Sequence, residues 1–247
     1  MVAAMTNRPP ASLPESRSSA REIDAFLKEA HRVAAPAAGA ARLVFALDAT
    51  MSRQPTWDMA SRVQAAMFHA AAAVGGLSVQ LVYFRGFREC RASRWVADPR
   101  RLAELMGKIR CEAGETQIAR VLGHVLEEGG REPIRALVYV GDAMEEGLDG
   151  LCAKAGQLGL LGVKAFMFHE GGQDGVAAAY GEIARLTGGA AFAFDSRAPA
   201  ELEALLRAVA AYAAGGRAEL DRLAARDAGA RRLAASLPRL GGPGGRP

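Results

Sequence analysis

The chain has 247 residues, of which 50% are hydrophobic and 23% charged, proportions that exclude a disordered, collagen-like or coiled-coil polymer. Charged and polar residues interrupt every apolar run before the roughly 18 residues that a membrane-spanning helix needs, and the first twenty residues lack the pattern of a secretory signal, so we expect a cytoplasmic protein with no membrane association. The net charge of +4 resides at the two ends, because residues 36–214 carry nineteen basic and twenty acidic side chains, and this balance excludes a nucleic-acid partner.

Two segments precede the main part of the chain. Residues 1–18 are rich in proline, serine and arginine and are expected to form a disordered N-terminus. Residues 19–39 are expected to form an amphipathic helical extension, because Ser19 and Glu22 make a capping box and the apolar residues after them recur on one helical face. This helix is predicted to run to about His31.

Residues 40–214 alternate short apolar runs with longer helical stretches. This alternation predicts an α/β fold, a three-layer, Rossmann-like, doubly wound domain with a mostly parallel six-stranded sheet. Five of the strands are expected at Leu43–Leu47, Val79–Phe84, Ala136–Val140, Val163–Phe168 and Ala191–Phe194. Helices are expected at Pro55–Val74, Pro99–Gly107, Gln117–Glu128, Leu148–Leu160, Gly175–Thr187 and Pro199–Ala213.

Two further elements complete the expected fold. The segment Phe87–Val96 follows a turn signal at Gly86 and alternates polar with apolar residues, which predicts one antiparallel edge strand. Residues 215–247 are expected to form an Arg-rich helical tail with a flexible end, the helix spanning Arg217–Ser236. Its apolar stripe is interrupted by Asp227 and Gly229.

Oxygen-bearing side chains follow two predicted strands and open one predicted helix. In doubly wound sheets ligands bind beyond the carboxyl ends of the strands, so these positions are candidates for a site. Two carboxylates and three hydroxyls supply the hard oxygen ligands that suit Mg²⁺ or Mn²⁺. The five candidate metal ligands are Asp48, Thr50, Ser52, Thr116 and Asp142. Thr116 is also placed to cap the helix that it precedes.

The order of these residues resembles the metal-ion-dependent adhesion site of von Willebrand factor type A (VWA) domains, in an intracellular, bacterial type of protein. The resemblance rests on Asp48-x-Thr50-x-Ser52, then Gly114-x-Thr116-x-Ile118, then Asp142 after a strand, and covers about Ala40–Ala214. The usual family pattern is D-x-S-x-S, so Thr50 departs from it.

The resemblance implies a protein-interaction module rather than an enzyme. By that resemblance, the three hydroxyls would hold Mg²⁺ (or Mn²⁺) directly or through water, and Asp48 and Asp142 would bind metal-bound waters or the ion itself. An Asp or Glu of a protein partner would complete the coordination. An AAA-type ATPase or another multi-subunit complex is the partner class that the family suggests.

Two alternatives use the same residues or the tail. A haloacid-dehalogenase-like phosphatase would use Asp48 as nucleophile and Gly141-Asp142 with the acids after it as its late motif. That family needs a lysine before the late acids to neutralise the phosphorylated aspartate, and no lysine lies between Thr116 and Asp142. The third possibility is a scaffold with a non-functional metal site, whose tail makes the contacts.

The remaining candidate groups carry weaker signals. His169 ends the fifth predicted strand and is expected to be a solvated loop histidine. Glu145 and Glu146 follow Asp142 closely and could occupy the open metal position from within. The three cysteines have no C-x-x-C spacing and are predicted to be separate thiols: Cys90, Cys111 and Cys152.

Overall fold

The structure is a computed structural model that describes residues 39–54, 76–195 and 198–238. It contains one six-stranded sheet with the strand order β3-β2-β1-β4-β5-β6. The strands are β1 (Ala41–Asp48), β2 (Leu77–Arg85), β3 (Glu89–Val96), β4 (Ala136–Gly141), β5 (Lys164–Glu170) and β6 (Ala190–Phe194). Neighbouring strands are parallel except for the β2–β3 pair. The predicted α/β class, the six strands and the antiparallel edge strand are confirmed.

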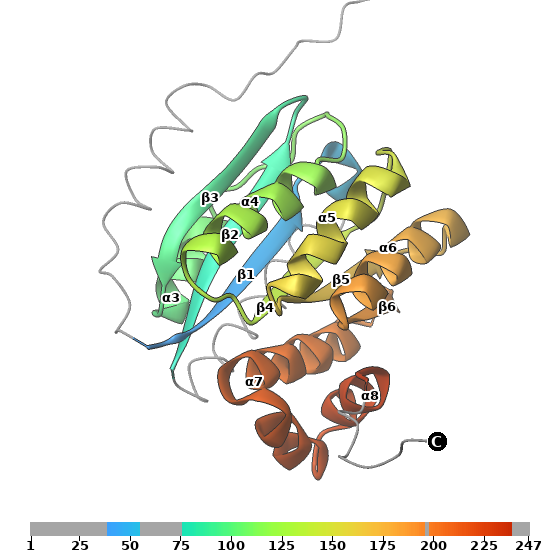
Figure 1. Cartoon of the computed structure of the whole chain (residues 1–247). Coiled ribbons are helices and arrows are strands. Elements are labelled where there is room, and N and C mark those ends of the chain that lie inside the picture. The colour runs from blue at the N-terminus through green and yellow to red at the C-terminus, as the bar shows by residue number, and fades with distance from the viewer. Residues whose placement is uncertain (1–38, 55–75, 196–197, 239–247) are drawn as a thin grey trace, which may run out of the picture.

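Helices cover both faces of the sheet and make three layers. Figure 1 shows α4 and α5 lying across the front of the strands. The helices are α3 (Pro99–Met106), α4 (Ile118–Arg131), α5 (Leu148–Leu160), α6 (Asp174–Thr187), α7 (Pro199–Ala224) and α8 (Ala228–Ser236). The predicted N-terminal extension and the predicted helix Pro55–Val74 lie outside the described residues, as does the end of the tail after residue 238.

Alternate residues of β1 contribute to two separate cores. Leu43, Phe45 and Leu47 pack on the side of α3, α7 and α8, whereas Val44 and Ala46 pack on the side of α4, α5 and α6. Successive side chains of a strand point to opposite faces, and a central parallel strand buried on both faces is therefore an almost unbroken apolar run. This burial fixes the sheet that positions the loops at its carboxyl edge.

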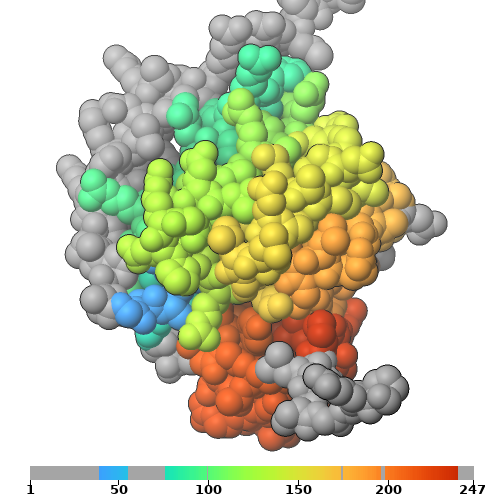
Figure 2. Space-filling view, in the orientation of Figure 1, coloured from blue at the N-terminus to red at the C-terminus, as the bar shows by residue number. Residues whose placement is uncertain are grey.

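The C-terminal helices differ from the predicted ones. The helix expected to end at Ala213 reaches a kink at Gly216, whose dihedral angles are non-helical (φ 69°, ψ −158°), in the predicted break before Arg217, and α7 then continues only to Ala224. Only glycine adopts such a φ without strain. A second helix then begins after Asp227, whose side chain accepts a hydrogen bond from the amide of Ala230 at 2.9 Å. In the space-filling view α7 and α8 form the lower part of the molecule (Figure 2).

The parallel strands bring their carboxyl ends to one edge of the sheet. Leu47 of β1 pairs with Val140 of β4, and Gly141 pairs with His169 of β5. Asp48 and Glu170 therefore end β1 and β5 at this edge, and Asp142 directly follows β4 between them. Among residues 39–54, 76–195 and 198–238, no helix has the length and apolar character needed to cross a membrane.

Candidate functional site

The first loop at the carboxyl edge folds around the Asp48 carboxylate. Asp48 is only 1% exposed, and its Oδ1 accepts a hydrogen bond from the amide of Thr50 at 2.8 Å. The hydroxyl oxygens of Thr50 and Ser52 lie 3.0 Å apart. This loop is held by the short 3₁₀ helix Met51–Arg53. The D-x-T-x-S spacing thus places two hydroxyls side by side, next to a buried carboxylate.

Asp142 brings a second carboxylate to this loop from the adjacent strand. Burial raises the pKa of the Asp48 carboxyl to about 6, and the negative charge of Asp142 adds to this rise, against the lowering effect of the hydrogen bonds from Thr50. Asp48 Oδ2 and Asp142 Oδ1 are both buried and have no hydrogen-bond partner among the described residues. Buried carboxylate oxygens without a hydrogen-bond partner are costly unless a cation balances their charge.

Thr116 reaches the same edge through contacts with both neighbouring loops. The amide of Glu112 donates to the carbonyl of Ala49 at 3.0 Å, so the segment before Thr116 runs beside the first loop. Thr116 is also bonded to the loop of Asp142: its amide donates to Glu145 Oε2 at 2.9 Å, and its hydroxyl oxygen accepts from the amide of Glu145 at 3.1 Å. Thr116 is buried at this junction.

The prediction that Thr116 caps α4 is wrong. The residue that precedes α4 is Gln117, and its side chain makes no capping bond. Glu146 takes this role instead, because its carboxylate accepts from the amides of Ile118 and Ala119, the latter at 2.9 Å. A carboxylate suits the positive end of the helix dipole. Glu145 and Glu146 thus bind amides at and before the start of α4.

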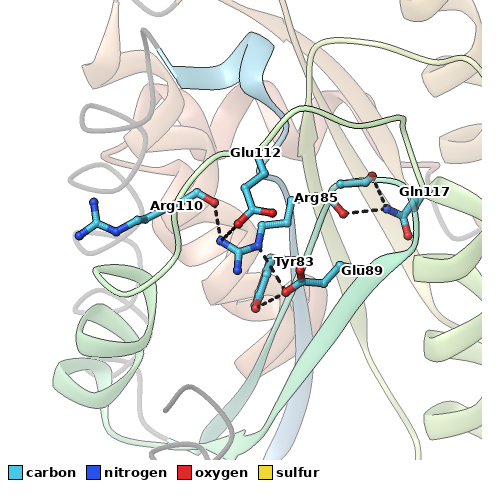
Figure 3. A network of polar contacts seen from close by, with 7 residues as sticks. Tyr83, Arg85, Glu89, Arg110, Glu112 and Gln117 are labelled. Atoms are coloured by element: carbon cyan, nitrogen blue, oxygen red, sulfur yellow. Dashed lines mark hydrogen bonds and ion pairs between the residues drawn. The ribbon is translucent and has the colours of Figure 1, made fainter. Parts of the chain in front are cut away.

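Arg85 fixes the loop that carries Thr116 (Figure 3). It is buried at the end of β2, where it donates to the carbonyl of Arg110 at 2.8 Å and lies 3.2 Å from Glu112 and 3.3 Å from Glu89. On the other side Gln117 Nε2 donates to the carbonyl of Arg85 at 3.1 Å.

Gly114 allows the same loop to approach β2 closely. A Cβ at this position would lie 2.1 Å from the carbonyl oxygen of Gly86, so the backbones could not meet with any other residue there. The G-x-T spacing therefore has a structural basis in this contact.

Arg53 is a buried cation at the site that no sequence pattern predicts. It is 1% exposed, forms an ion pair with Glu170 at the end of β5 and lies 6.0 Å from the centre of the Phe194 ring. Burial lowers the pKa of its guanidinium, and the charges of Asp142 and Asp48 oppose that effect. Its position directly after Ser52 is visible in the sequence, but nothing in the sequence indicates that its side chain turns inward.

His169 is not the solvated loop residue that was predicted. It lies in β5, which extends two residues beyond the predicted strand, and is 2% exposed. Burial lowers the pKa of its imidazole, so the ring is neutral at pH 7, although the charge of Asp142 acts in the opposite direction. Its ring packs edge-on against Tyr180, with 5.8 Å between ring centres. The longer strand carries the side chain into the interior.

The structure thus collects oxygen ligands of the predicted types at one edge of the sheet. Asp48, Thr50 and Ser52 are in contact, Asp142 is on the adjacent strand end, and Thr116 is bonded to the loop after Asp142. Within the described part of the chain, no group of three or more His, Cys, Asp or Glu side chains could hold a metal ion. A cation site here would therefore depend on hydroxyl as well as carboxylate oxygens.

No protein-family model matches the sequence, and no curated protein is significantly similar to it. Solved structures do resemble its fold. A von Willebrand factor type A protein from Catenulispora acidiphila is 16% identical, with a TM-score of 0.56 over 71% of this chain and 43% of that one. The SpRpn10 VWA domain is 10% identical, with a TM-score of 0.53 over 63% of this chain and 88% of that domain.

A third similar structure holds a metal. Proximal thread matrix protein 1 from the mussel byssus, with a zinc-occupied MIDAS motif, is 16% identical to this chain, with a TM-score of 0.56. The match covers 70% of this chain and 46% of the mussel protein. The sheet order, the placement of the loops and these three likenesses agree with one another. The chain has the von Willebrand factor type A fold.

Proposed function

We propose that the chain is a protein-interaction module whose contact with its partner depends on Mg²⁺ or Mn²⁺. The residues that would hold the cation are Asp48, Thr50, Ser52, Thr116 and Asp142. The observation that carries this proposal is a pair of buried carboxylate oxygens, Asp48 Oδ2 and Asp142 Oδ1, neither of which has a hydrogen-bond partner within the described residues. A divalent cation would balance this charge.

The chemistry of the donors supports a hard cation. Mg²⁺ takes oxygen ligands in a nearly octahedral arrangement and keeps several waters, so a few protein oxygens suffice. When bound, the cation would supply a positive charge that can accept a carboxylate from outside. The hydroxyls of Thr50 and Ser52, 3.0 Å apart, would face that shared position from the first loop.

The partner in this proposal is a protein that presents an Asp or Glu side chain. Met51, in the middle of the first loop, is 50% exposed and offers an apolar contact beside the site, as methionines often do at interaction surfaces. An AAA-type ATPase or another multi-subunit complex in the cytoplasm is the partner class that we propose, on the strength of the sequence resemblance.

Direct measurement of metal binding tests the proposal. Calorimetric titration with Mn²⁺ and Mg²⁺ should show one site in the full chain, and Asp48→Asn should weaken binding at least about tenfold. Asp221→Asn, an exposed residue in an i,i+4 ion pair with Arg217, is the control for the loss of one carboxylate. Affinity capture from the host lysate with Mg²⁺ or EDTA then identifies the partner. Binding of either cation by Asp48→Asn as tightly as by the parent chain would reject the site.

The scaffold with a non-functional metal site is the second candidate function, and Arg53 favours it. Its guanidinium already places one positive charge beside Asp48 and Asp142. In that case partner capture would be indifferent to EDTA. The phosphatase alternative needs a cation free to meet a phosphorylated Asp48, whereas the guanidinium of Arg53 pairs with Glu170. Hydrolysis of phosphate esters that Asp48→Asn abolishes would revive that alternative.

A further inference from the structure

Four charged side chains that are buried or half-buried lie at the carboxyl ends of β1, β4 and β5 and in the short helix after β1. Three are negative, on Asp48, Asp142 and Glu170, and Arg53 is the positive one. These four side chains together carry two net negative charges, which one divalent cation would cancel. The charge of Arg53 therefore directly affects how tightly this cluster binds any cation.

Glu170 fixes the position of Arg53 within this cluster. The guanidinium pairs with the Glu170 carboxylate and lies near the face of the Phe194 ring, so two elements beyond the metal loops, β5 and β6, hold it. Asp48 Oδ2 and Asp142 Oδ1 meanwhile have no hydrogen-bond partner among the described residues. The guanidinium is thus paired with Glu170, while one oxygen of each aspartate accepts no hydrogen bond from the described residues.

We propose that Arg53 is a built-in counter-ion of this site and that Glu170 decides whether it competes with the metal. Paired with Glu170, Arg53 leaves the two aspartates to a divalent cation and moderates its affinity. Without Glu170, the guanidinium would turn to Asp48 and Asp142 and exclude the cation. This inference rests on the proposed function and names the residues that regulate the metal.

A double-mutant cycle tests the inference. The affinity for Mn²⁺ is measured in the parent chain, two single variants and the double variant, by isothermal titration calorimetry and by the electron paramagnetic resonance signal of unbound Mn²⁺. Arg53→Met removes the internal cation and should tighten Mn²⁺ binding at least about tenfold, because a neighbouring unit charge acts strongly at a low effective dielectric constant. Glu170→Gln removes the carboxylate that pairs with Arg53 and should weaken binding by a similar factor.

The double variant Arg53→Met/Glu170→Gln restores the parent net charge and leaves neither partner of the pair buried alone. Its affinity should return to within about threefold of the parent chain, because the cluster has the parent's net charge and no guanidinium is present to compete with the metal. Circular dichroism of all four chains checks that each one folds. The double variant keeps the test decisive if Arg53→Met alone unfolds, because Glu170→Gln and the double variant then form the comparison.

The possible outcomes separate this inference from the proposed function. Mn²⁺ binding of equal strength in all four chains would overturn the role of Arg53 and leave the metal site intact. Weaker binding in Arg53→Met would overturn it as well. Binding in Arg53→Met but not in the parent chain would support the built-in counter-ion and make the parent the metal-free scaffold. The absence of binding in all four chains would overturn the metal site itself.

Discussion

Thr116 and Glu145 exchange two hydrogen bonds across loops that are 29 residues apart in the chain, one through the side chain of each residue. The bond from the Thr116 amide to Glu145 Oε2 depends on the Glu145 side chain, whereas the bond to the Thr116 hydroxyl uses the Glu145 backbone. The side chain of Glu145 therefore helps to orient Thr116 without being a metal ligand in our proposal.

We expect Glu145→Ala to weaken Mn²⁺ binding about tenfold, the usual effect of removing a residue that orients a ligand. Glu145→Gln keeps an oxygen acceptor for the Thr116 amide and should bind Mn²⁺ within about threefold of the parent chain. Isothermal titration calorimetry gives the Mn²⁺ affinity of both variants. Equal losses in the two variants would show that the charge of Glu145, rather than its hydrogen bond, matters.

Replacement of Arg85 should destabilise the whole fold. Arg85→Met leaves the half-buried Glu89 and Glu112 beside an apolar side chain, and loss of one partner from a fully buried ion pair lowers the free energy of unfolding by up to about 3–5 kcal/mol. Arg101→Met, which breaks an exposed pair with Glu104, should cost less than about 1 kcal/mol. Urea denaturation of both variants gives the comparison. A similar small cost in both would contradict the bracing role of Arg85.

Glu146 should stabilise the start of α4. Glu146→Ala leaves the amides of Ile118 and Ala119 without their acceptor and should lower the free energy of unfolding by about 1–2 kcal/mol, as loss of a helix cap does. Glu127→Ala, an exposed change on the same helix, should stay within about 0.5 kcal/mol of the parent chain. Thermal denaturation followed by circular dichroism distinguishes them, and an equal effect in both variants would speak against the cap.

The three thiols should react at different rates. Burial raises the pKa of Cys111 to about 12 and that of Cys90 to about 11, against 9.0 for a free thiol. Because only the thiolate attacks, alkylation of Cys111 at pH 8 should be about a thousandfold slower than that of a free thiol, and that of Cys90 about a hundredfold slower.

Cys152 is half-buried on α5 and should be alkylated first by iodoacetamide. Peptide mass spectrometry over time gives the three rates, and the same reaction in urea, where burial is lost, should make them nearly equal. Fast labelling of Cys111 in the folded chain would contradict its buried position.

Much of the fold could be predicted because its signals are local. The apolar run that forms β1 and the helical spacing that forms α5 are readable from a few successive residues, and the predicted helix Leu148–Leu160 has the same bounds as the observed one. The antiparallel β3 was predicted from its alternation after Gly86. The strand ends then placed Asp48 and Asp142 at one edge by topology alone.

The errors concern contacts between distant segments. Glu146 caps a helix that begins 28 residues earlier, and Arg53 pairs with Glu170 on a strand that is more than a hundred residues away. No local sequence pattern predicts these two contacts, because they form only after the sheet has brought the distant segments together. His169 was misjudged for the same reason, since its burial depends on the neighbours of β5 rather than on its own flanking residues.

The bend at Gly216 determines how the C-terminal arm, residues 217–238, can be tested as a binding element. It turns the chain so that Leu220, Leu233 and Leu237 enter the same core as β1 and α3. Truncation after Gly216 would therefore unfold the protein and abolish any interaction indirectly. Arg226 and Arg231 are exposed on this arm, and Glu at these two positions would reverse its outer charge without disturbing the interior. Charge reversal, rather than deletion, is the experiment that can distinguish an arm that binds a partner from one that only stabilises the fold.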